Sequence, residues 1–261
     1  MREIDLKEIK QRQLEILIKV KEFCDLNNID YFLDCGTLLG AVRHKGYIPW
    51  DDDIDIGMTR VNFDKFVSLF NKDNNSSLRC YTYQNKKDFY FAYAKVCDIN
   101  TTLYEHNQEK SKQYVNIDVF VYDSVSSDKA KVDKLFNKRE RYLRLNRLKN
   151  FQDFKNNNIV KKITYIALLI LPKDYFIKKL DKLSRSQKFR DGYLANIASF
   201  DNMYISLDAL EPYKELEFEG IMFKVPNDTD RWLKGYFNDY MTPPPVEKRV
   251  EAHHFKAYVN D

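Results

Sequence analysis

Four aspartates occur within five residues of one another in the first quarter of the chain. They are Asp51, Asp52, Asp53 and Asp55. The apolar residues that separate and follow them alternate with a period of two, which is typical of a strand. Because residues two apart on a strand share a face, we expect Asp53 and Asp55 to point the same way. Ile54 and Ile56 would then face the core.

Two carboxylates on one strand face repel each other, and one takes up a proton unless a cation lies between them. A hard divalent cation that prefers oxygen ligands resolves this conflict. Asp118, in VNIDVFVYD, is another acid inside an apolar strand pattern and is the expected third ligand. The sequence therefore predicts a metal site of Asp53, Asp55 and Asp118 that holds Mg²⁺, with Mn²⁺ as an alternative. The competing structural interpretation is a loop in which the acids only cap the next element.

A Gly-Thr pair precedes these acids and is expected to form a turn. Gly36 and Thr37 lead into LLGAVRH, which has the pattern of a short helix, so its first N–H groups could bind phosphate. A turn and helix followed by two acidic strands is similar to the arrangement in polymerase-β-like nucleotidyltransferases. The expected fold is α/β (α+β), of the nucleotidyltransferase type, with a mixed sheet flanked by helices and a basic helical insertion.

A longer resemblance includes these motifs. The segment YFLDCGTLLGAVRHKGYIPWDDDIDIGMTR resembles the signature of the LicD family, which also includes the fukutin-related proteins. The similarity continues in AKVCDINTT, in VNIDVFVYDS and in the tail from ELEFEG to VEAHH, about two thirds of the chain in all. One departure is YFNDY at Tyr236 to Tyr240, where family members commonly have Tyr-Gly-Asp-Tyr. It leaves the local turn open but does not affect the metal site.

The resemblance implies a phosphotransferase. In this family CDP-choline or another CDP-linked alcohol gives its phospho-alcohol to a hydroxyl of a cell-surface glycan, such as a teichoic-acid or lipopolysaccharide precursor, and CMP is released. The expected group is phosphocholine, and the expected acceptor is lipid-linked. Phosphoryl transfer needs mainly positioning and charge neutralisation, which the predicted metal and cations would supply.

Carried over to this sequence, the resemblance assigns metal binding to Asp53 and Asp55. It assigns phosphate or nucleotide binding to Gly36, Thr37 and Arg43. Asp118 would complete the metal site and could accept the proton of the attacking hydroxyl.

Four further residues have two interpretations each. Trp50 could belong to the core or face a trimethylammonium group. Lys95 could bind phosphate or be an edge-strand lysine with an exposed ammonium group. Arg249 and His253 lie in the family-like tail, which favours a substrate-binding role, but as surface residues they need none.

Two other classes of function stay open at this point. A nucleotidyltransferase that moves a nucleoside monophosphate to a small molecule would release pyrophosphate instead of CMP. An inactive glycan-binding scaffold would turn nothing over, although the acids at Asp53, Asp55 and Asp118 argue against it.

The length of 261 residues suits one domain. We divide it into an N-terminal helix (1–28), a catalytic core (29–125), a basic helical region (126–200) and a C-terminal hairpin and helix (201–261). The four cysteines lack the spacing of a zinc site or a disulfide framework, and no signal peptide is apparent, which indicates the cytoplasm.

Charge is distributed unevenly. Residues 129–190 contain 19 Lys and Arg against 5 Asp and Glu, a net charge of about +14. The whole chain carries +4, so the remaining residues carry about −10. It is either a solvated helical surface or a site of peripheral attachment to anionic membrane, which would be the inner face of the plasma membrane. No recognition motif for nucleic acid is present. The apolar run ITYIALLILP is about half the length that a membrane span requires.

Periodicity and turn residues predict the remaining elements. An Asp5–Glu8 capping box should begin the first helix, which Asn27-Asn28 should end. The expected strands are 29–34, 53–58, 78–83, 89–98 and 114–123, the expected hairpin turns at Glu219-Gly220, and further helices are expected at 61–70, within 128–190 and at 228–237.

Overall fold

The structure is a computed structural model that describes residues 1–72, 77–105, 113–151, 159–186, 192–199, 201–237, 239–249 and 255–260. The helices are α1 (Leu6–Asn27), α2 (Cys35–His44), α3 (Arg60–Phe70), α4 (Lys129–Asn150), α5 (Ile159–Leu168), α6 (Tyr175–Arg185) and α7 (Thr229–Tyr236), with short 3₁₀ helices η2 (Leu207–Ala209) and η3 (Val246–Lys248). The strands are β1 (Arg2–Ile4), β2 (Phe32–Leu33), β3 (Asp55–Thr59), β4 (Leu78–Tyr81), β5 (Ala94–Glu105), β6 (Gln113–Val125), β7 (Tyr193–Ala195), β8 (Tyr204–Ser206), β9 (Lys214–Phe218), β10 (Ile221–Val225) and β11 (Phe255–Val259).

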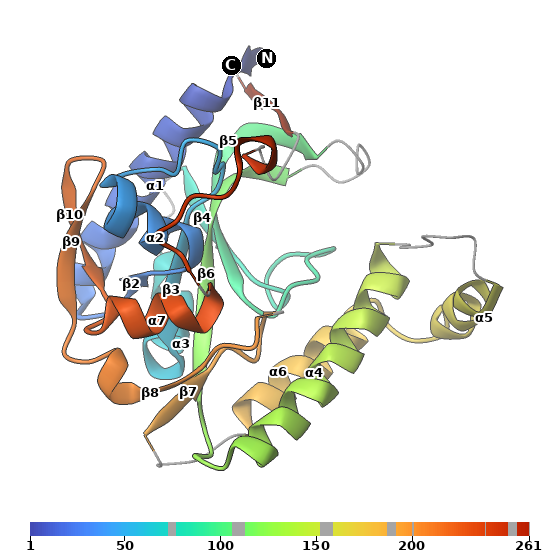
Figure 1. The fold of residues 1–261 in the computed structure, drawn as a ribbon. Coiled ribbons are helices and arrows are strands. Elements are labelled where there is room, and N and C mark those ends of the chain that lie inside the picture. Colours follow the sequence, from blue (N-terminus) through green and yellow to red (C-terminus); the bar gives the residue numbers. More distant parts are fainter. Residues whose placement is uncertain are drawn as a thin grey trace.

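A mixed sheet runs through the molecule in the order β1-β11-β5-β6-β3-β2 (Figure 1). β3 and β6 are parallel, whereas the other pairs along this path are antiparallel. β4 extends the sheet beside β5, and β7 and β8 extend it from the end of β6. The expected α/β class with a mixed sheet is therefore confirmed.

The two faces of the sheet are covered by different helices. α1 and α3 contact each other through Phe23, whose ring centroid lies 5.8 Å from that of Phe66 and 4.9 Å from that of Phe70. α7 packs from the other side, where the Trp232 ring lies 5.0 Å from Phe32 and 5.3 Å from Tyr122. Since Tyr122 shares a strand face with Asp118, α7 covers part of the face that carries the acids.

Local signals account for several element ends. The Asp5 side chain accepts a hydrogen bond from the Glu8 N–H at 2.8 Å and begins α1, and Asn28 ends it at φ 51°. The capping box forms only in part, because the Glu8 carboxylate binds Arg2 and Arg12 instead of closing it. The β9–β10 hairpin turns at Glu219-Gly220 as expected, with both residues at positive φ.

Some expectations were wrong in detail. Gly36 and Thr37 lie inside the first turn of α2 and not in a turn before it, because Asp34 caps the helix by accepting from the Cys35 N–H at 2.9 Å. β5 begins at Ala94 instead of residue 89, and β7 lies inside the stretch that we assigned to the basic helical region. β1, β8 and β11 were not predicted.

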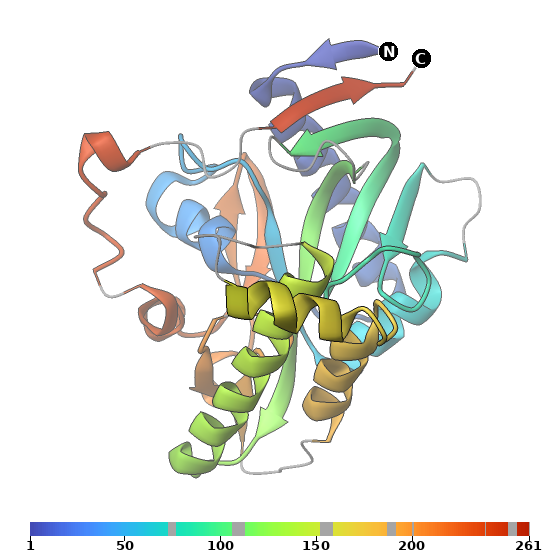
Figure 2. The same ribbon diagram turned by 90° about the vertical axis from the view of Figure 1, so that its right-hand side faces the viewer.

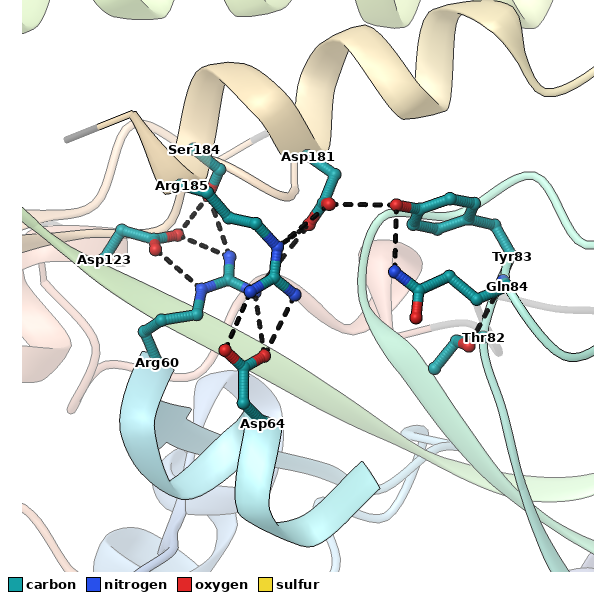
Figure 3. A network of polar contacts seen from close by, with 9 residues as sticks. All are labelled: Arg60, Asp64, Thr82, Tyr83, Gln84, Asp123, Asp181, Ser184 and Arg185. Atoms are coloured by element: carbon teal, nitrogen blue, oxygen red, sulfur yellow. Dashed lines mark hydrogen bonds and ion pairs between the residues drawn. The ribbon is translucent and has the colours of Figure 1, made fainter. Parts of the chain in front are cut away.

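Two arginines fasten α6 to the sheet and to α3 (Figure 3). Arg60 of α3 binds both carboxylate oxygens of the buried Asp123 of β6, at 2.7 and 2.8 Å. Ser184 of α6 donates to Asp123 and accepts from Arg60. Arg185 of α6 binds Asp64 of α3 through two hydrogen bonds of 2.7 and 2.9 Å. The basic helices are therefore joined to the core by paired charges.

Candidate active site

Three adjacent strands align charged side chains in one row. Asp55 of β3 stands opposite Asp118 of β6, and Asp118 stands opposite Lys95 of β5. Cross-strand partners share a face of the sheet, so the three side chains project together. The parallel pairing of β3 with β6 thus brings together acids that are 63 positions apart in the sequence.

Lys95 forms an ion pair with Asp118, with 2.5 Å between Nζ and Oδ1, and also donates to Asn116 Oδ1 at 3.1 Å. Its Nζ lies 5.5 Å from the ring centroid of Phe91 and 5.8 Å from that of Tyr93. Burial alone would lower the pKa of Lys95, but the Asp118 carboxylate outweighs it and the pKa is raised. β5 lies between β4 and β6, so Lys95 is not on an edge strand.

Asp55 is the most enclosed of the predicted metal ligands. It is only 8% exposed, and its backbone N–H donates to Thr37 Oγ1 at 2.8 Å, which ties the start of β3 to α2. Burial raises the pKa of Asp55 well above its usual value, and the nearby charges of Asp53 and Asp118 raise it further. The carboxylates are therefore close enough for their charges to conflict.

The segment before β3 supplies further oxygen atoms. Asp51, Asp52 and Asp53 each place a carboxylate oxygen so that the three atoms lie within 4.8 Å of one another. Burial and the neighbouring Asp53 raise the pKa of Asp51 to about 7. Asp51 Oδ2 lies 2.6 Å from the point where a Cβ on Gly36 would be, so this approach requires glycine. Asp51 is a site residue that the predicted ligand set does not include.

The donor chemistry of these groups fits a hard divalent cation. All the candidate ligands are carboxylate oxygens, the type that Mg²⁺ and Mn²⁺ prefer. The raised pKa values of Asp51 and Asp55 show that like charges are crowded here. A cation would relieve that repulsion, so the chemistry of the residues fits the predicted metal. Of the described acids, the three whose oxygens lie within 4.8 Å of one another are Asp51, Asp52 and Asp53, not the predicted set of Asp53, Asp55 and Asp118. Asp53 connects the two groups, because it interacts with both Asp51 and Asp55.

A buried carboxylate, Asp34, caps the N-terminus of α2 and is itself held by hydrogen bonds. Asp34 is fully buried and accepts hydrogen bonds from Trp232 Nε1 at 2.9 Å and from the Tyr122 hydroxyl. Burial raises the pKa of Asp34 to about 6. This network joins α2, β6 and α7, and the sequence analysis missed it. The available signal was an acid at the end of a strand before a helix, which is a cap pattern.

Arg249 lies over the ring of Trp50, and Arg43 is near Arg249. The Arg249 guanidinium lies 5.3 Å from the Trp50 ring centroid and donates to the Pro244 carbonyl at 2.8 Å. Arg43 donates to the Tyr240 carbonyl at 2.5 Å, and burial and the charge of Arg249 lower its pKa. Trp50 is half-buried against the core, and Arg249 lies over its ring; its contact with a trimethylammonium group stays a prediction. His253 lies outside the described residues.

Residues 28–152 match the family model described as LicD/FKTN/FKRP, nucleotidyltransferase domain. Over 275 aligned residues, which span 99% of this chain and 100% of the relative, the sequence is 29% identical to the lipopolysaccharide cholinephosphotransferase LicD of Haemophilus influenzae. Together the two matches support a LicD-family phosphotransferase. Two uncharacterized rickettsial proteins match over shorter stretches: 59 residues at 42% identity in Rickettsia typhi, covering 22% of this chain and 19% of the relative, and 44 residues at 52% in Rickettsia prowazekii, covering 17% and 16%.

The LicD-family match contains the acids from Asp51 to Asp55, Lys95 and Asp118. Trp232, which binds Asp34, and Arg249, which lies over Trp50, come from the C-terminal part beyond it. A separate cavity of about 340 Å³ opens between α3, residues 82–85 and α6, beside the Asp64–Arg185 pair (Figure 3). None of the clustered acids lines that cavity, but Tyr93, whose ring centroid lies 5.8 Å from Lys95 Nζ, does.

Proposed function

We propose that this phosphotransferase moves phosphocholine from CDP-choline, or the corresponding group from another CDP-linked alcohol, to a hydroxyl of a cell-surface glycan and releases CMP. The observation that carries the proposal is the row of Asp55, Asp118 and Lys95 across three strands. It combines carboxylates with a cation on one sheet face, which suits a diphosphate substrate. The relative in Haemophilus influenzae is named as a lipopolysaccharide cholinephosphotransferase, which supports this choice of group and of acceptor class.

Asp53, Asp55 and Asp118 would hold Mg²⁺, with Asp51 close enough to contribute. When bound, the ion would neutralise charge on the donor diphosphate. Asp118 can accept the proton of the acceptor hydroxyl, since a carboxylate on this face serves as a general base. Lys95, whose ammonium group lies against Asp118, can bind a phosphate oxygen of the donor. Thr37 keeps Asp55 in place through the backbone.

Two arginines and two tyrosines would bind the two ends of the donor, which are the nucleotide and the alcohol. Burial and the nearby charge of Arg249 lower the pKa of Arg43, and the two guanidinium groups would bind the nucleotide phosphate. On the same sheet face as the acids, Lys86 Nζ lies 4.3 Å from the ring centroid of Tyr81 and 4.5 Å from that of Tyr114. These rings already accept a cation between them, which is how proteins bind trimethylammonium groups.

We also propose the nucleotidyltransferase-type fold for the sheet and its flanking helices, and a cytoplasmic site of action on a lipid-linked acceptor. The description of the matching family model supports the first. The four free cysteines suit the second.

Product analysis tests the proposal. The purified chain is incubated with CDP-choline, Mg²⁺ and a glycan acceptor, and nucleotides are separated by chromatography while the glycan is weighed by mass spectrometry. We expect CMP and a glycan heavier by phosphocholine, with both lost in Asp118→Asn and kept in Asp25→Asn, an exposed acid paired only with Lys21 on α1. A nucleoside monophosphate on the acceptor without CMP would favour the rival nucleotidyltransferase, and no turnover would favour a scaffold.

The identity of the alcohol has its own measurement. CDP-choline, CDP-ethanolamine, CDP-glycerol and CDP-ribitol are compared in thermal-shift experiments with Mg²⁺, because a ligand that binds only the folded state raises Tm by mass action. We expect the largest shift with CDP-choline. An equal or larger shift with CDP-glycerol or CDP-ribitol, which carry no cation, would remove phosphocholine from the proposal and leave the phosphotransfer.

A further inference from the structure

The helix α5 exposes its apolar side. Ile159, Ile163 and Ile166 recur at the spacing of one helical face and are 71%, 62% and 64% exposed. Leu169 and Ile170, in the turn that follows α5, are 55% and 87% exposed. None of the residues of α5 is buried. A surface helix of a globular protein normally packs its apolar face against the core, whereas α5 turns this face toward solvent.

The polar side of α5 faces the protein. Lys161, Thr164 and Tyr165 are half-buried, whereas the isoleucines on the opposite side are exposed. The end of the helix is held by α4, where Lys149 Nζ donates to the Leu168 carbonyl at 2.5 Å and Asn150 donates to the Lys173 carbonyl at 2.9 Å. The structure therefore fixes the outward orientation of the apolar face. Figure 1 shows α5 standing off the body beyond α4, and in Figure 2, where this side faces the viewer, α5 lies in front.

We infer that this apolar face inserts into the headgroup boundary of an anionic membrane. The surrounding charge selects this occupant: residues 129–190 contain 19 Lys and Arg against 5 Asp and Glu. Lys162 of α5, Arg144 of α4 and Lys179 of α6 are exposed. Cations around an apolar face are the combination that binds anionic lipid surfaces. A second copy of the chain would bring two strongly basic regions together, which like-charge repulsion opposes.

The length of α5 makes it lie in the boundary and not cross it. Ten residues of helix span about 15 Å, half the thickness of a bilayer core. Among the described residues, no helix combines the length and the hydrophobicity that crossing requires.

The end of α4 that holds α5 also contacts residues beside the acids. At the end of α4, the Phe151 ring is 6.0 Å from Phe91, whose ring faces the Lys95 that pairs with Asp118. Asn146 of α4 also donates to the Tyr90 carbonyl at 3.0 Å. If the acceptor is carried on a lipid, as the proposed function holds, docking through α5 would bring its glycan near the site.

Vesicle sedimentation of the full chain tests the inference without any activity measurement. Vesicles of phosphatidylglycerol and phosphatidylcholine are compared with vesicles of phosphatidylcholine alone, at low and high salt. We expect strong binding to the anionic vesicles at low salt, and weaker binding at high salt because ions screen the contact. The double variant Ile163→Ser, Ile166→Ser should bind at least about tenfold more weakly, because two large apolar side chains no longer enter the lipid.

A matched control replaces exposed apolar residues elsewhere, Leu26→Ser with Val61→Ser, and should bind as the wild type does. Circular dichroism and the thermal melt check that each variant is folded. Equal binding by both double variants, or no binding to anionic vesicles at low salt, would overturn the inference. Dimers in sedimentation velocity that dissociate in the Ile163/Ile166 variant would do so too, in favour of a second copy. Failure of product formation with intact vesicle binding would instead count against the proposed function alone.

Discussion

Asp55 has its carboxylate buried among other acids, while its backbone is fixed by Thr37. Replacing that carboxylate by an amide removes a charge that the metal needs and that the metal-free protein does not tolerate well. We predict that Asp55→Asn abolishes transfer and raises the Tm of the metal-free protein at pH 8, by about 3 °C for each kcal/mol of repulsion removed. Melting curves in a chelator and the CMP assay measure the two effects.

The raised pKa of Asp55 determines how the stability of the metal-free protein changes with pH. Its pKa is raised in the folded state, so the folded protein holds that proton more tightly than the unfolded chain does. The stabilisation is complete below the unfolded pKa, near 4, and is lost as the pH rises through the folded value. The Tm advantage of Asp55→Asn should therefore grow from pH 5 to pH 8. A variant that loses stability at pH 8, or turns over normally with Mg²⁺, would contradict the assignment.

At this scale the sequence predicted the acids but not their supports. Asp55 and Asp118 lie on strands, as periodicity predicted, whereas Asp53 precedes β3, which begins at Asp55. The partner of Lys95 depends on the register between β5 and β6, which no short window contains. Asp34 acquires its role from Trp232, which is 198 positions away. Supports of this kind depend on tertiary contacts, so spacing alone could not find them.

α6 is attached through an ion pair that is largely shielded from solvent, so single substitutions in this pair should weaken the attachment. Asp123 is buried and binds Arg60 through both oxygens. We predict that Asp123→Ala lowers the free energy of unfolding by about 3–5 kcal/mol, because a buried guanidinium loses its partner. Urea unfolding measures this. The control Asp133→Ala breaks only an exposed pair with Lys129 and should cost less than about 1 kcal/mol; equal losses would show that the buried pair is not what fastens α6.

Among the elements, long periodic segments were predicted well and short ones poorly. α1, α7 and the β9–β10 hairpin carry their own caps or turn residues. β7 and β8 are three residues each and exist because they pair with β6 and with each other. The aromatic run before β5 looks like a strand in sequence, yet residues 89–93 precede the strand and pack toward α4. Propensity cannot separate such a run from a strand.

Over the whole molecule, the two ends of the chain meet in the sheet. β11 lies between β1 and β5, with Ala257 opposite Ile4 on one side and Leu103 on the other. We predict that Ala257→Pro destabilises the fold by about 3 kcal/mol or more, because proline removes a donor from a strand that is paired on both sides. Ala257→Ser keeps the donor and is the control. Urea unfolding should separate the two variants, and similar midpoints would mean that β11 contributes little.

This position of β11 also affects biosynthesis. A ribosome makes β1 first, yet within the described residues β1 pairs with β11 alone, so the strand must wait while everything up to Phe255 is translated. Until then the growing chain carries β5 with an open edge that could pair with other nascent chains. A messenger that is cut short before β11 would yield a product with that edge exposed for good. β11 therefore marks the point in synthesis after which β1 and β5 can complete their pairing.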